Sequence, residues 1–267
     1  MWRFVALFLA LLAGVVAAVW YYRTPEVRNV VRVVRNDDRW IDDLQSRVPK
    51  QAESAAAEVE QRGTAALPLI RKTLQDPAAD PLRRKAALKA CGILGARAAE
   101  AVPDVAALLH DPNYTAEAAL ALSFMGSAAV APLREASGVE EANVRREAMR
   151  SLGKLRERAS IDPQLVIPQL LHALDDEDAS VRHVAVTYLG IVRDSPGDEV
   201  PGLIKALDDE EAEVRQAAAV ALGQYGALAE PAVPALRKAA KDPDEDVQRE
   251  AGRALVTIAE KKKPPAL

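Results

Sequence analysis

Hydrophobic positions over most of the chain recur in pairs of short amphipathic segments. In the second segment of each pair, an alanine is followed four residues later by a larger apolar residue. The alanine column contains Ala87, Ala118, Ala148, Ala185, Ala218 and Ala251, and the second column contains Cys91, Leu122, Leu152, Leu189, Leu222 and Leu255. A spacing of four places both columns on one face of an α-helix, where the small side chains allow close helix contact. The pattern therefore predicts a series of second helices that pack through this face.

A shorter amphipathic segment with a proline near its start lies upstream of each second helix. The prolines are Pro68, Pro103, Pro132, Pro168, Pro201 and Pro234. Proline suits the first turn of a helix, because the N–H group that it lacks would have no partner there. Each unit is therefore predicted to be a short helix, a turn and a second helix. Neither helix can bury its apolar stripe alone, so we expect the units to stack into an all-α solenoid.

The later units share a detailed sequence pattern. Residues 175–190 read DDEDASVRHVAVTYLG and residues 208–223 read DDEEAEVRQAAAVALG. The aspartates at the turn, the step Val-Arg-x-x-Ala-x-x-x-Leu-Gly and the proline of the first helix together resemble HEAT repeats. They are most similar to the short HEAT-like units named after phycobilisome lyases. The resemblance covers residues 65–260 and implies a right-handed α-solenoid of about six helical hairpins.

The acidic turns have two interpretations, a metal site or a structural role. An EF-hand reading of the run that starts at Asp175 fails, because Val186 stands at the twelfth position, where a bidentate Glu is required. Acidic residues ahead of a helix cap its free N–H groups and favour the positive end of its dipole. The resemblance to HEAT units further implies a ladder of bonds between turn aspartates and second-helix arginines of neighbouring units. The residues at these positions are Asp176, Arg182, Asp209 and Arg215.

The two ends of the chain differ from the repeats. Residues 4–22 form an apolar run of nineteen residues without a charge, long enough to cross about 30 Å of hydrocarbon as a helix. Residues 1–22 are therefore predicted to be a transmembrane anchor, with a cleaved signal peptide as the alternative. Basic residues after this run, beginning with Arg23, favour a single-pass membrane protein whose repeats lie on the cytoplasmic side. The exported side is the alternative.

Three further segments complete the predicted organisation. Residues 23–36 have apolar positions at helical spacing and are interpreted as a juxtamembrane linker. Residues 37–64 resemble a degenerate repeat with a more polar outer face, which is the character that a terminal cap of a repeat array needs. Residues 261–267, KKKPPAL, are predicted to be a disordered tail.

Charge and chemistry narrow the function classes. The net charge of −4 disfavours a general nucleic-acid binder. Cys91 is the only cysteine and occupies a core column, so we interpret it as an apolar filler. Paired His-Glu dipeptides, HExxH, CxxC and Gly-rich phosphate loops do not occur in the sequence. The sequence thus predicts no catalytic residues, no metal site and no cofactor.

One ridge of the second helices carries several basic residues. We count from the valine of the Val-Arg step, a position that Arg83, Tyr114, Val144, Val181, Val214 and Val247 occupy in the six units. The residues two and six positions later include Lys85, Lys89, Arg146, Arg150, His183, Arg249 and Arg253. Residues at i and i+4 share one helical ridge, and this ridge lies off the buried stripe. The resemblance to HEAT arrays implies that second helices line the inner face of the solenoid. We therefore predict that the ridge binds a partner, and an ordinary solvated face is the alternative.

Two functional hypotheses follow. The first is a membrane-tethered, non-catalytic HEAT-repeat scaffold that mediates protein–protein interaction through its inner face. Its partner would be a protein, with an acidic or extended segment as the bound element. The alternative, which the family resemblance implies, is a lyase-like or enzyme-assisting protein that acts on a chromophore or protein substrate. The sequence leaves the oligomeric state open.

Overall fold

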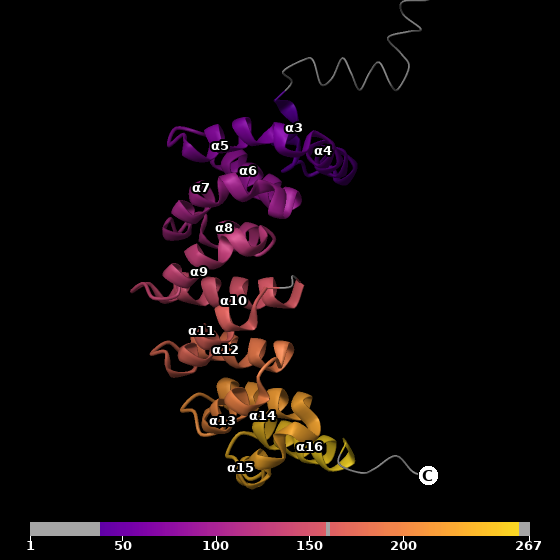
Figure 1. The fold of residues 1–267 in the computed structure, drawn as a ribbon, viewed down its shortest axis with the longest axis vertical. Helices are drawn as coiled ribbons and strands as arrows, with labels where there is room; N and C mark the ends of the chain where they lie inside the picture. Colours follow the sequence, from indigo (N-terminus) through magenta and orange to yellow (C-terminus); the bar gives the residue numbers. More distant parts are fainter. Residues whose placement is uncertain (1–37, 159–160, 262–267) are drawn as a thin grey trace, which may run out of the picture.

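The computed structural model describes residues 38–158 and 161–261. Across these two ranges every regular element is a helix. The helices stack unit upon unit along one axis, with the first helices of the hairpins on one side and the second helices on the other (Figure 1). The predicted all-α solenoid is confirmed.

Six helical hairpins follow an N-terminal helix pair within the described ranges. The pair is α3 (Arg39–Asp43) and α4 (Pro49–Arg62). The hairpins are α5 (Leu67–Gln75) with α6 (Pro81–Leu94), α7 (Val102–Ala107) with α8 (Thr115–Leu122), α9 (Val130–Ala136) with α10 (Ala142–Arg158), α11 (Ile167–His172) with α12 (Ala179–Val192), α13 (Pro196–Ala206) with α14 (Ala212–Tyr225), and α15 (Val233–Ala239) with α16 (Glu245–Lys261).

Short 3-10 segments connect these helices. Five of them lead into first helices, and two extend first helices toward the turn. They are η1 (Gly63–Ala66), η2 (Gly95–Ala101), η4 (Gly126–Ala129), η5 (Pro163–Leu165) and η7 (Gly226–Ala232) in the first group, and η3 (Leu108–His110) and η6 (Ala173–Asp175) in the second. Gly95 and Gly226 end α6 and α14 with φ of 58° and 57°, a backbone region that glycine enters without a steric penalty.

The core consists of the two columns that define the repeat. All six alanines of the first column are completely buried, and so are the first five residues of the second column. Leu255 of α16 is only partly buried, and α16 is the last helix that the structure describes. At the other end, α3 and α4 bury Trp40, Ile41 and Val59 against the first hairpin.

Glycine after the second column allows the second helices to approach each other closely. A Cβ atom on Gly153 would lie 2.2 Å from Cγ of Tyr188, and one on Gly190 would lie 2.8 Å from Cβ of Ala221. Real Cβ atoms do not approach other heavy atoms this closely. The tight packing of α10 on α12, and of α12 on α14, therefore requires glycine at these two positions.

One first helix begins earlier than its repeat proline predicts. Helix α13 begins at Pro196 and contains Pro201 in its interior. Pro196 occupies the first turn, where a missing N–H group costs nothing, so the helix starts there instead. The other repeat prolines, including Pro68 and Pro234, lie within the first turns of their helices.

The prediction of a single-pass membrane protein is corrected. Among residues 38–158 and 161–261, no helix is long and apolar enough to span a bilayer. The longest of these helices, α10 and α16, have 17 residues each and would reach only about 25 Å. The apolar run of residues 4–22, the linker of residues 23–36 and residues 262–267 of the predicted tail lie outside the described residues.

Candidate binding surface on the second helices

The second-helix face is the exposed side of the stack formed by α6, α8, α10, α12, α14 and α16 (Figure 1). The seven ridge residues predicted from the sequence lie on four of these helices. Lys85 and Lys89 belong to α6, Arg146 and Arg150 to α10, His183 to α12, and Arg249 and Arg253 to α16. All seven are at least partly exposed. They differ in how much of their charge is already neutralised within the protein.

The two lysines of α6 bind to neighbouring elements. Nζ of Lys85 lies 2.5 Å from Oε1 of Glu117 in α8. Nζ of Lys89 donates a hydrogen bond of 2.9 Å to the carbonyl oxygen of Leu44. Lys89 therefore retains its net charge, whereas the Lys85–Glu117 pair is neutral.

The arginines of α16 are balanced by acidic residues of the same helix. Arg249 forms ion pairs with Asp246 and Glu250, and Nη1 of Arg253 lies 2.9 Å from Oε1 of Glu250. Two guanidinium groups thus face two carboxylates. The predicted ridge is consequently not a uniformly basic surface, and its C-terminal end carries no surplus of positive charge.

The positive charge concentrates on α10. Arg146, Arg150, Lys154 and Arg158 follow one another at every fourth residue of this helix, and we call them the α10 basic row. Three intervals of four residues correspond to about 18 Å along the helix. Glu147 is buried between Arg146 and Arg150, with its Oε1 3.3 Å from the nearest nitrogen of each.

The pKa of Lys154 reflects the positive charge of its neighbours in this row. Burial lowers the pKa of Lys154, and the positive charges of Arg158 and Arg150 lower it further, against the opposing effects of Glu147 and Glu157. The row therefore carries four cations against these two acids, and its members repel one another. A carboxylate placed beside the row would relieve this repulsion.

His183 and Tyr188 of α12 lie next to the α10 basic row. His183 borders a hollow of about 440 Å³ together with Arg146, Arg150 and Glu213. The ring of Tyr188 packs over Gly153 of α10. The structure thus brings together three of the sequence-predicted ridge residues on adjacent helices, beside an aromatic side chain that the ridge pattern does not include.

An apolar hollow of about 370 Å³ lies between α6 and α8. Its lining includes Leu88, Ile93, Leu120 and Phe124. Leu120 and Phe124 are 48% and 42% exposed, which is high for large hydrophobic side chains. The guanidinium carbon of Arg158 lies 4.4 Å from the centroid of the Phe124 ring, within the range of a cation–π contact. The hollow therefore adjoins one end of the α10 basic row.

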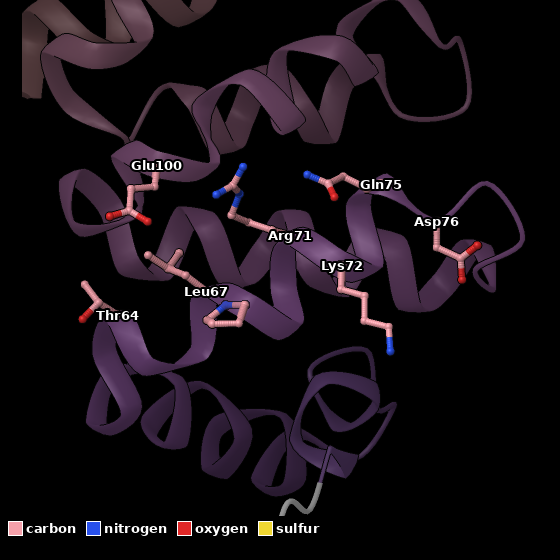
Figure 2. Close-up of a pocket in the computed structure, with 8 residues that line it drawn as sticks. Thr64, Leu67, Arg71, Lys72, Gln75, Asp76 and Glu100 are labelled. Atoms are coloured by element: carbon pink, nitrogen blue, oxygen red, sulfur yellow. The ribbon is translucent and has the colours of Figure 1, made fainter.

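A wider hollow of about 740 Å³ lies along α5 on the first-helix side (Figure 2). Nε of Arg71 and Nε2 of Gln75 donate to the carboxylate of Asp104, at 2.6 and 2.7 Å. Figure 2 shows that the side chain of Lys72 points away from that of Arg71. The polar groups of this hollow are thus spread along the helix or already bonded, and they do not converge on one ligand position.

A ladder of buried ion pairs joins the later units. Arg145 binds both carboxylate oxygens of Asp176, Arg182 binds those of Asp209, and Arg215 binds those of Asp242, all at 2.8 or 2.9 Å. Arg182 also donates to the backbone carbonyl of Asp176 in its own turn, at 2.9 Å. Each guanidinium therefore joins its own turn to the turn of the following unit, which holds the second helices in a defined register.

The ladder includes a residue that the sequence pattern does not single out. The carboxylate of Asp176 accepts its bonds from Arg145 of the preceding unit. Arg145 follows Val144 as Arg182 follows Val181, so the Val-Arg step was the available signal. In the last described unit Gln248 takes the place of the arginine, and its side chain donates to the carbonyl of Asp242 in its own turn.

The one thiol of the chain is inaccessible. Cys91 is completely buried, and burial raises the pKa of its thiol to about 12. Within residues 38–158 and 161–261, no cluster of three or more His, Cys, Asp or Glu side chains is arranged to hold a metal ion. The most distinctive chemistry of the second-helix face is therefore its combination of cations and exposed apolar side chains.

Comparison with known proteins agrees with this architecture. The family model of HEAT repeats matches residues 130–200 and 200–267, which is more than half of the chain. The chain belongs to the HEAT-repeat family. No curated protein matches the sequence.

Solved structures show the same fold at low sequence identity. Importin beta has a TM-score of 0.58 at 15% identity, over 83% of this chain and 33% of its own length. Kap95p, solved with RanGDP, has a TM-score of 0.62 at 12% identity, over 86% of this chain and 35% of its own. The CpcE–CpcF complex of phycocyanin lyase from Nostoc sp. PCC7120 has a TM-score of 0.50 at 24% identity, over 58% of this chain and 98% of its own. This HEAT-repeat chain spans about a third of the length of importin beta or Kap95p, and these likenesses show the fold alone.

Two candidate binding residues of this HEAT-repeat chain, Lys154 and Arg158, were not part of the ridge predicted from the sequence. Lys154 and Arg158 continue the series of Arg146 and Arg150 at the same spacing of four. They lie beyond the Leu-Gly step that ends the repeat pattern, so aligning the units does not reveal them. Extending each i, i+4 series to the end of its helix would have found both residues.

Proposed function

We propose that this HEAT-repeat protein is a non-catalytic scaffold that binds an acidic segment of a protein partner on its second-helix face. The observation that carries this proposal is the α10 basic row, four cations at every fourth residue of one helix. The other ridge helices offer no comparable surplus, since Lys85 of α6 is paired with Glu117, which leaves Lys89 as the unpaired cation of that ridge, and the α16 arginines are balanced by acids.

The surroundings of the row suit recognition of a flexible segment. The buried ladder holds α10 and α12 in register, so the cations of the row lie on a rigid support. On binding, the partner segment would therefore lose conformational entropy, but α10 would lose little. Each exposed ion pair contributes only about 0.2–1 kcal/mol. Binding through several such contacts is therefore expected to be moderate in affinity and to weaken as salt concentration rises.

A lyase-like or enzyme-assisting role lacks comparable support. The likeness to phycocyanin lyase rests on the fold, and a shared fold does not imply a shared function. Cys91, the one thiol of the chain, is buried with a raised pKa, so it is unsuited to act as a nucleophile or a chromophore acceptor.

Crosslinking pull-down with the full-length protein tests the proposal. We expect the double variant Arg146→Glu/Arg150→Glu to lose the partners that the wild type captures. The variant Arg249→Glu/Arg253→Glu changes the same charges at equivalent positions of α16 and is the matched control, expected to retain them. Far-UV circular dichroism establishes that both variants fold. Partners retained unchanged by the first variant would show that the α10 basic row is not the binding surface.

A further inference from the structure

The apolar character of α8 is local to one unit. Leu120 occupies the ridge column that holds Lys89, Arg150 and Arg253 in other units. Phe124 lies four residues further along, so the two side chains share one exposed edge of the hollow between α6 and α8. The second-helix face therefore changes from apolar at α8 to basic at α10.

The two parts of this surface are in direct contact. Arg158, the last residue of the α10 basic row, lies over the ring of Phe124. Lys154, Arg150 and Arg146 then lead away from the hollow along α10. Arg158 is therefore the member of the α10 basic row nearest to a ligand in the hollow, and the other members follow along α10.

We propose that the hollow between α6 and α8 binds one large apolar side chain of the partner segment, and that acidic residues beside this anchor lie along the α10 basic row. This inference rests on the proposed function and defines the partner more narrowly. The partner motif is an extended segment with one bulky apolar residue next to an acidic run. At about 3.3 Å per residue, a row of about 18 Å matches an acidic run of five or six residues.

The size of the hollow and the charges around it select this occupant. A volume of about 370 Å³ lies near the lower end of the range of about 300–1,000 Å³ for sites that bury whole small molecules. The hollow therefore has room for one bulky apolar side chain. Lys89 and Arg158 flank it with positive charge, and the one acid in its lining, Glu117, is neutralised by Lys85. Acidic neighbours of the anchor are thus favoured over basic ones.

A second copy of the chain fits this surface less well. In a two-fold symmetric contact, the same patch of each copy would face the other. Two hollows packed together would bring two α10 basic rows close to each other, and the mutual repulsion already felt by Lys154 would increase. A partner of opposite charge avoids this cost.

Fluorescence anisotropy with the full-length protein and a labelled peptide tests the inference. The peptide carries a central Ser-Phe pair with five acidic residues on each side, so that either chain direction can match the row. One control peptide replaces Ser-Phe with Ser-Ser, and another replaces the acids with glutamine. We expect the parent peptide to bind at least about tenfold more tightly than either control, which corresponds to about 1.4 kcal/mol.

Protein variants locate the anchor site. Leu120→Gln is expected to weaken binding of the parent peptide about tenfold and to leave the affinity for the Ser-Ser peptide unchanged. Val220→Gln is the matched control, because Val220 occupies the same column on α14 and is 39% exposed. It is expected to change binding less than about twofold. Lys154→Gln/Arg158→Gln is expected to weaken binding of both acidic peptides.

The outcomes separate this inference from the proposed function. If Leu120→Gln behaves like Val220→Gln while Lys154→Gln/Arg158→Gln weakens binding, the acidic-segment function stands and the anchor site is refuted. If the parent peptide does not bind, both are refuted. If sedimentation shows a dimer that Leu120→Gln dissociates, and no peptide binds, the hollow is covered by a second copy and the inference is wrong.

Discussion

Two adjacent aspartates in one turn allow a direct test of the buried ladder. Asp209 accepts two hydrogen bonds from Arg182, and the two side chains are only 9% and 8% exposed. Asp208 pairs with Lys238 of the next unit at 2.6 Å, but these side chains are 64% and 75% exposed. We therefore expect Asp209→Asn to destabilise the protein far more than Asp208→Asn, although the substitution and the turn are the same.

The expected magnitudes follow from burial. Asp209→Asn removes one charge-assisted hydrogen bond, worth about 1.5–3 kcal/mol, and leaves Arg182 short of a counter-charge, where breaking a buried pair costs about 3–5 kcal/mol. Asparagine keeps one acceptor oxygen for Arg182, so we expect a loss of about 3 kcal/mol. The exposed Asp208–Lys238 pair is screened by water, so Asp208→Asn should cost less than about 1 kcal/mol.

Urea unfolding followed by far-UV circular dichroism measures both free energies, and a pH series adds a second criterion. Burial on its own raises the pKa of Asp209, but hydrogen bonds from Arg182 and from the Glu211 amide more than offset this, and the net shift is downward. The stability contributed by the ionised Asp209 is therefore present above its unfolded pKa, near 3.8, and is lost as pH falls through the folded pKa. The difference between wild type and Asp209→Asn should shrink in that acidic range.

Two results would refute this reasoning. Equal destabilisation by Asp208→Asn and Asp209→Asn would show that burial does not set the strength of these pairs. A difference between wild type and Asp209→Asn that persists at pH values well below 3.8 would show that the charge of Asp209 is not its source.

Three further predictions concern single buried positions. Gly153→Ala places a Cβ 2.2 Å from Cγ of Tyr188 and should lower the unfolding free energy by about 1–3 kcal/mol, whereas Gly252→Ala in open space should be neutral or stabilising by up to about 1 kcal/mol in the same urea assay. Burial raises the pKa of Glu199, so the stability of the wild type should fall as pH rises from about 4.5 through the folded pKa. In thermal melts, Glu199→Gln should abolish this pH dependence. An unchanged pH profile in this variant would contradict the prediction. Cys91, with a pKa of about 12, should react with a thiol-specific dye at pH 8 only after unfolding, and rapid labelling of the folded protein would show that it is accessible.

The repeat architecture could be predicted because its signals are local. The alanine column and the apolar column four residues later require only the geometry of a single helix, and the structure buries them as expected. Proline and glycine act within one or two turns, so most helix starts followed from them. The start of α13 at Pro196 departs from the pattern because that linker contains a second proline.

The binding surface was predictable only in part. The i, i+4 series identified Arg146 and Arg150, but the sequence pattern does not show that Glu117 of α8 pairs with Lys85 of α6. Acidic residues on neighbouring helices can neutralise members of such a series. A column of basic residues in the sequence therefore overstates the net positive charge of the surface. The apolar run of residues 4–22 led to a prediction of membrane insertion that the described helices do not bear out.

The amino-acid pattern alone thus establishes the fold, because a period of 3.6 residues and a repeated turn are properties of short segments. How one unit lies on the next depends on the stacking step, which is the shift and rotation from one helical hairpin to the following one. That step places Arg182 against Asp209 rather than against the carboxylate of Asp176, and it sets the ring of Tyr188 over Gly153. It also brings Arg158 of α10 over Phe124 of α8, which joins the basic row to the apolar hollow. Contacts between residues of different units depend on the angle and spacing of whole helices, and these are fixed by packing rather than by any local sequence preference.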